Sequence, residues 1–88
     1  MQTLRVDTET MRVEMARAEI GPSALAERAG VHRNCISRIL RTGTADLDSI
    51  GAITFALNET LREAGYAEIG PYGLLTPTEV APRGLPTP

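Results

Sequence analysis

The stretch Leu25–Gly43, with the sequence LAERAGVHRNCISRILRTG, decides the fold that we expect. Its apolar side chains recur three or four positions apart, as they do on the buried face of a helix: Leu25, Ala26, Ala29, Ile36, Ile39 and Leu40. Gly30 interrupts this pattern, and glycine readily takes the left-handed conformation that ends many helices. We therefore predict two short helices, 22–29 and 32–42, joined by a tight turn, which is a helix-turn-helix arrangement.

The same stretch concentrates the positive charge of the chain. From 22 to 43 there are four arginines and one glutamate, whereas the other 66 residues hold five arginines and ten carboxylates, and the formal net charge is −2. Every basic residue is an arginine, whose planar guanidinium suits phosphate oxygens and guanine edges. A local cationic helix in an acidic chain predicts an anionic partner for that helix alone.

Helical patterns also flank this stretch. Residues 7–20 predict a first helix, because apolar side chains recur there at helical spacing behind a polar capping residue. Residues 47–57 predict a fourth helix and 59–64 a short fifth one, separated by Asn58. A single bent helix from 47 to 64 fits the pattern equally well. The prediction is an all-α domain of four to five short helices.

The C-terminal end has a different composition. Residues 66–88 contain five of the six prolines and three of the eight glycines, so no further helix of any length is expected there. We predict a domain at 1–65, with the helix-turn-helix at 22–41, followed by this Pro/Gly-rich tail. Apolar side chains predict that the tail packs on the domain or on a partner to about residue 75, with disorder beyond it.

The motif resembles that of a known family. LAERAGV, followed by a polar helix with ISRI and then a glycine, is similar to the helix-turn-helix of the Xre/Cro-type bacterial and phage transcriptional repressors. Four residues fall in register with the family pattern: Ala26, Gly30, Val31 and Ile36. The resemblance implies a small lambda-repressor-like domain that binds double-stranded DNA. A homodimer on a palindromic operator would act as a transcriptional regulator, most simply as a repressor, with autoregulation as one form of that role.

The resemblance also implies roles for individual residues. The positions that read bases fall on Arg33, Asn34, Ser37 and Arg38, where arginine suits guanine and asparagine suits adenine. Contacts with the DNA backbone are expected from Arg28, His32, Arg41 and Thr42. His32 is also placed to cap its helix. The dimer interface is expected in the C-terminal part, at Phe55, Leu61, Tyr66, Leu74 and Leu75.

Composition argues against several other classes of protein. One cysteine, Cys35, allows no internal disulfide, and one histidine leaves no ligand set of the zinc type. The nucleophile, base and orienting group of an enzyme are absent as a set, so we predict no catalysis and no cofactor. The chain starts without the pattern of a signal peptide and has no apolar run that could span a membrane, which predicts a soluble cytoplasmic protein.

Three alternatives stay open from the sequence. An antitoxin would bind its operator through this domain and a toxin partner through the C-terminal tail. The controller protein of a restriction-modification system would carry the same motif. A protein-interaction module would have kept the fold without binding DNA, and the negative net charge and Pro22 at the start of the first motif helix favour that interpretation.

Overall fold

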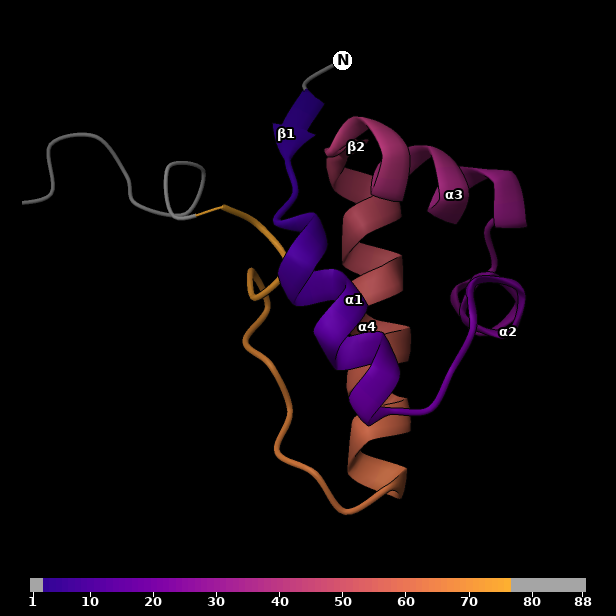
Figure 1. Ribbon diagram of the computed structural model, residues 1–88, viewed down its shortest axis with the longest axis vertical. Helices are drawn as coiled ribbons and strands as arrows, with labels where there is room; N and C mark the ends of the chain where they lie inside the picture. The colour runs from indigo at the N-terminus through magenta and orange to yellow at the C-terminus, as the bar shows by residue number, and fades with distance from the viewer. Residues whose placement is uncertain (1–2, 77–88) are drawn as a thin grey trace, which may run out of the picture.

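The computed structural model describes residues 3–76 of the 88-residue chain. This part forms four helices and a two-stranded antiparallel sheet, joined by loops (Figure 1). In chain order the elements are β1 (Thr3–Arg5), α1 (Thr8–Arg17), α2 (Pro22–Ala29), α3 (Arg33–Thr42), β2 (Thr44–Asp46) and α4 (Leu47–Glu63). The described part is mostly helical, as predicted, but the sheet corrects the all-α prediction. The disorder predicted beyond residue 75 falls, apart from Thr76, outside the described residues.

The two short helices predicted around Gly30 are present as α2 and α3. Gly30 has a φ of 74° and Gly43, which ends α3, has a φ of 73°, so both glycines take the left-handed conformation. Val31 donates its N–H to the carbonyl of Ala26 at 3.0 Å and packs against the core. The local signals in the sequence are sufficient here because each helix ends at a glycine.

Three of the helices end with the same hydrogen-bond pattern. After each of the helices α1, α2 and α4, one residue takes the left-handed conformation: Glu19 (φ 53°), Gly30 (φ 74°) and Gly65 (φ 85°). The following N–H then returns to a carbonyl five residues earlier, in the pairs Ile20 to Met15, Val31 to Ala26 and Tyr66 to Leu61. Because Glu19 takes this conformation, α1 ends at Arg17, three residues before the predicted end.

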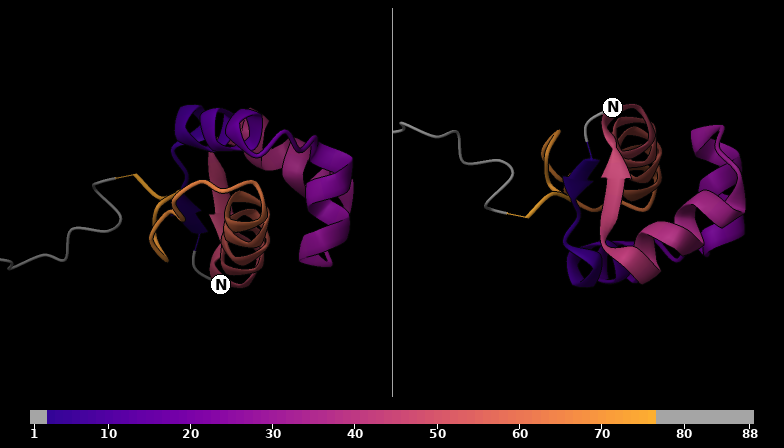
Figure 2. Two further views of the ribbon diagram at one scale, coloured as in Figure 1. Left: turned by 90° about the horizontal axis from the view of Figure 1, so that it is seen from below. Right: turned by 90° about the horizontal axis from the view of Figure 1, so that it is seen from above.

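The sheet joins the N-terminal segment to the residues that follow α3. Arg5 lies opposite Thr44 in the antiparallel register, and the N–H of Val6 donates to the carbonyl of Gly43 at 2.9 Å. The other edge of this segment meets the C-terminal residues, since the N–H of Thr76 donates to the carbonyl of Arg5 at 3.1 Å. Seen from above, β1 and β2 lie side by side where α3 ends (Figure 2).

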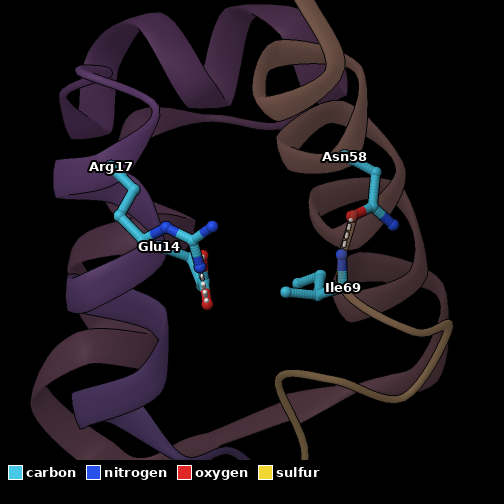
Figure 3. A network of polar contacts seen from close by, with 4 residues as sticks. All are labelled: Glu14, Arg17, Asn58 and Ile69. Carbon is cyan, nitrogen blue, oxygen red and sulfur yellow. Dashed lines mark hydrogen bonds and ion pairs between the residues drawn. The ribbon is translucent and has the colours of Figure 1, made fainter. Parts of the chain in front are cut away.

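The fourth helix runs unbroken from Leu47 to Glu63, which matches the single-helix alternative and corrects the division at Asn58. Asn58 lies inside the helix, and its side-chain oxygen accepts a hydrogen bond from the N–H of Ile69 at 2.7 Å (Figure 3). The asparagine therefore fastens the C-terminal segment to α4 instead of ending the helix. Within residues 3–76, no helix is both long enough and apolar enough to cross a membrane.

The core lies between α4 and the other helices. Its largest fully buried side chains come from every helix and from the C-terminal segment: Met11, Leu25, Ile36, Ile39, Ile53, Leu57, Leu61 and Leu74. Leu75 is also buried, at 9% exposure. The assignment of Leu61, Leu74 and Leu75 to a dimer interface is thus corrected. A domain this small, with so few aromatic residues, uses these leucines to complete its own core.

Candidate nucleic-acid interface

The outer face of α3 is polar and cationic. Its exposed side chains include all the residues of this helix that the sequence analysis assigned to DNA: Arg33, Asn34, Ser37, Arg38, Arg41 and Thr42. The helix contains no aspartate or glutamate. On the opposite side, Ile36 and Ile39 are buried, which fixes the orientation of α3 on the domain. The cationic face is therefore presented to solvent by a rigid support.

The arginines of the described part of the chain fall into two groups. Three form ion pairs, with N–O distances of 2.9, 2.7 and 3.6 Å: Arg17 with Glu14, Arg28 with Glu63 and Arg62 with Glu68. By contrast, Arg33, Arg38 and Arg41 form no ion pair with any residue between 3 and 76. These three guanidinium groups keep their charge and their donors free for an outside partner.

Arg28 does not belong to this free group. Its guanidinium donates to Glu63 at 2.7 Å and to the Thr60 hydroxyl at 3.0 Å, so it connects α2 to α4. The hydrogen bond with Glu63 is the largest cause that raises the pKa of Arg28. The predicted phosphate contact therefore competes with an existing ion pair, and we leave Arg28 out of the proposed interface.

His32 occupies the N-cap position of α3. Its Nδ1 accepts a hydrogen bond from the N–H of Asn34 at 3.0 Å. This is the capping role that the sequence predicted, and it satisfies one of the free donors at the start of the helix. Because Nδ1 is the acceptor, a neutral ring carries its proton on Nε2, and the exposed side chain can offer that proton to a phosphate.

Two arginines that the sequence analysis did not select lie beside the C-terminal end of α3. Arg12, on α1, donates from Nη2 to the carbonyl of Leu40 at 3.2 Å. Arg5, on β1, pairs with Thr44, whose hydroxyl lies 3.1 Å from that of Thr42. Both arginines are exposed and form no ion pair within residues 3–76. No short motif could have shown this, because Arg12 and Leu40 are 28 positions apart.

One carboxylate borders the cationic face. Asp46 caps α4 by accepting a hydrogen bond from the N–H of Ser49 at 3.2 Å. Hydrogen bonds from the Ser49 side chain and backbone lower the pKa of Asp46, and the charge of Arg38 adds a smaller attraction in the same direction. Asp46 therefore stays ionised, with its oxygens engaged in the cap.

A second surface feature is apolar and lies along α4. This helix and residues of the segment Glu68–Tyr72 line a hollow of about 460 Å³. Three exposed apolar side chains line it: Leu47, Phe55 and Tyr72. Of the predicted dimer residues, Phe55 is 67% exposed, whereas Tyr66 is partly covered by the guanidinium of Arg17, 5.1 Å from its ring centre.

Comparisons with known proteins add no family or function. No protein-family model matches the chain, and neither the curated proteins nor the solved structures contain a match. Within the described residues, Cys35 is a partly buried free thiol, and no group of three or more His, Cys, Asp or Glu side chains could hold a metal ion. Two surfaces therefore remain as candidate binding sites, the cationic face of α3 and the apolar hollow beside α4.

Proposed function

We propose that this protein is a sequence-specific DNA-binding transcriptional regulator, in which α2 and α3 act as a helix-turn-helix. The observation that carries the proposal is the outer face of α3, where Arg33, Arg38 and Arg41 are exposed without a carboxylate partner in the described part of the chain. Cations that stabilise a fold are usually paired or spread over a surface. Three unpaired arginines on one rigid helix favour an anionic ligand such as DNA.

Within this proposal the residues of α3 divide into two roles. Arg33, Asn34 and Arg38 read base edges, with Ser37 beside them, because arginine can bond to guanine and asparagine to adenine through two hydrogen bonds each. Arg41, in the last turn, contacts a phosphate and positions the helix. The Thr42 hydroxyl donates to the carbonyl of Arg38 at 2.8 Å, so the phosphate contact predicted for Thr42 would replace that hydrogen bond. Ala26 supports this arrangement, since its small side chain is buried at 2% exposure where α2 packs against the rest of the domain.

A homodimer would give the protein a longer binding site. One such helix reads about four base pairs, and two copies related by a two-fold axis read two half-sites about one helical turn apart. We assign the contact between copies to the apolar surface of Leu47, Phe55 and Tyr72. A two-fold contact needs one self-complementary patch, and this surface has both exposed apolar side chains and a hollow that could receive them from the other copy. Phe55→Glu should make the protein monomeric in sedimentation analysis while the helical circular dichroism stays unchanged.

The same hollow favours a second candidate function. In a protein-interaction module, another protein would occupy the apolar surface and α3 would bind no DNA. The antitoxin alternative also needs a partner site on the C-terminal tail, which lies mostly outside the described residues. Both candidates differ from the regulator in a measurable way: the module binds no duplex, and the antitoxin binds its operator and a second protein.

Selection of duplexes from a random-sequence pool tests the proposed function. The protein should enrich a two-fold symmetric site, and fluorescence anisotropy should then show tighter binding to that site than to unrelated DNA. Arg38→Ala should weaken binding about 5- to 150-fold for each half-site, corresponding to a loss of about 1–3 kcal/mol per protomer, with a much smaller effect on unrelated DNA. Arg62→Ala is the charge-matched control, because Arg62 lies towards the far end of α4 (Figure 1). Failure to bind any duplex at low salt would reject the regulator.

A further inference from the structure

The cationic surface extends beyond α3 because the fold brings the N-terminal segment to the end of that helix. We propose that Arg5 and Arg12 bind phosphates of the same duplex that α3 reads, so that the DNA backbone is contacted from a second element. This inference rests on the proposed function and adds an interaction surface to it. Neither the motif nor its family resemblance assigns these two residues.

Arg12 is held in place by its contact with α3. The carbonyl of Leu40 belongs to the last turn of the helix, where carbonyl groups lack a partner within the helix. Arg12 Nη2 supplies that partner at 3.2 Å. A guanidinium has five N–H donors, so most of them stay available on the exposed side chain. An arginine that is already ordered loses less conformational entropy when it binds a phosphate.

Arg5 is positioned by the sheet. Side chains alternate between the two faces of a strand, and Leu4 packs against the core, so Arg5 lies on the opposite, exposed face together with Thr44. The hydroxyl of Thr44 lies 3.1 Å from that of Thr42, which in turn donates to the carbonyl of Arg38 at 2.8 Å. Arg5 therefore continues a line of polar side chains that begins on the base-reading face of α3.

A phosphate would meet less negative charge at the end of α3 than at a helix C-terminus whose carbonyls have no partner. Exposed carbonyls give that end partial negative charge, which repels an anion. Arg12 bonds one of these carbonyls, and the neighbouring carboxylates of Asp7 and Asp46 are engaged in capping α1 and α4. Glu9, one turn before Arg12, is an exposed carboxylate, and its charge adds to those of Asp7 and Asp46 in opposing DNA binding.

The salt dependence of DNA binding measures this surface. Each phosphate contact that is lost should lower the slope of log K against log salt by about 0.9, so Arg5→Ala/Arg12→Ala should reduce it by about 1.8 per protomer. The loss should be the same for the selected site and for unrelated duplexes, because phosphates carry no sequence information. Glu9→Gln should strengthen binding, and Arg62→Ala should leave the slope unchanged.

A matched pair of variants separates phosphate binding from support of the helix. Arg12→Lys keeps the charge and should keep the slope, whereas Arg12→Gln keeps a polar side chain without the charge and should lose about 0.9 of slope per protomer. Thermal denaturation of both variants measures any loss of support for the helix. A wild-type slope in Arg5→Ala/Arg12→Ala, with DNA binding intact, would overturn this inference alone. Absence of DNA binding in the wild-type protein would instead overturn the proposed function.

Discussion

The arginines at the two ends of the molecule have different environments. Near the C-terminal end of α4, three arginines, Arg17, Arg28 and Arg62, each form an ion pair with a carboxylate of the same domain. At the opposite end, where α3 lies, the arginines form no ion pair within residues 3–76 (Figure 1). Arginine residues therefore stabilise the packing of elements at one end of the molecule, whereas those at the other end remain unpaired. A count of charges along the sequence cannot separate these roles, because pairing depends on which helices pack together.

Of the three arginines that form ion pairs, Arg17 should cause the largest change in the free energy of unfolding when it is substituted. Its guanidinium bonds both oxygens of Glu14, at 2.9 and 3.1 Å, and the Glu14 side chain is buried (Figure 3). Arg17→Met should leave this carboxylate without its partner and lower the free energy of unfolding by about 1–3 kcal/mol. Urea denaturation measures the loss. Affinity for DNA, measured well below the melting temperature, should stay at the wild-type value.

Arg28 should give a smaller loss of stability. Its ion pair with Glu63 is exposed to solvent on both sides, and solvent screens such pairs so that they contribute little to stability. Thermal denaturation should show a small decrease for Arg28→Ala and a smaller one for Glu63→Gln, because Arg28→Ala also removes the hydrogen bond to the Thr60 hydroxyl. The salt slope of DNA binding should not change. A slope reduced by about 0.9 per protomer in Arg28→Ala would move Arg28 into the group that contacts phosphates.

Asp46 should show the smallest effect, and this effect should disappear at acid pH. Its pKa in the folded protein lies below the ordinary value of about 3.9, so the ionised form stabilises the fold above that pH, and the contribution disappears as the pH falls through the folded pKa. Asp46→Asn keeps a capping oxygen without the charge. The stability difference between the two proteins should therefore shrink below about pH 4 in denaturation series. A constant difference from neutral to acid pH would show that the charge has no role.

The region from α2 to α3 could be predicted in detail from the sequence. Gly30 and Gly43 mark the ends of their helices, and the apolar spacing between them identifies the buried face. These signals are local, so they require no knowledge of the rest of the fold. The exposed residues of α3 followed directly from that assignment, because every position that is not on the buried face points outward.

The remaining differences come from contacts between residues far apart in the sequence. The strand at Thr44–Asp46 exists because Thr3–Arg5 lies beside it. Three residues are too few for an alternating pattern to be recognised in the sequence alone. Asn58 lies inside α4, and its side-chain oxygen accepts a hydrogen bond from the N–H of Ile69, eleven positions along the chain. Leu74 is buried in the core, and the sequence does not show which distant residues it packs against. Arg12 was missed for the same reason, since its partner is on α3.

The central claim is that the unpaired arginines of α3 form the DNA-binding surface. The most direct test compares the wild-type protein, Arg33→Ala/Arg38→Ala/Arg41→Ala and Arg62→Ala in fluorescence anisotropy with a short duplex over a range of salt concentrations. The account predicts salt-dependent binding by the wild type and by Arg62→Ala, and near-complete loss in the triple variant with its helical circular dichroism unchanged. Equal binding by all three proteins would contradict the assignment of the site to α3, and no binding by any of them would contradict the proposed function.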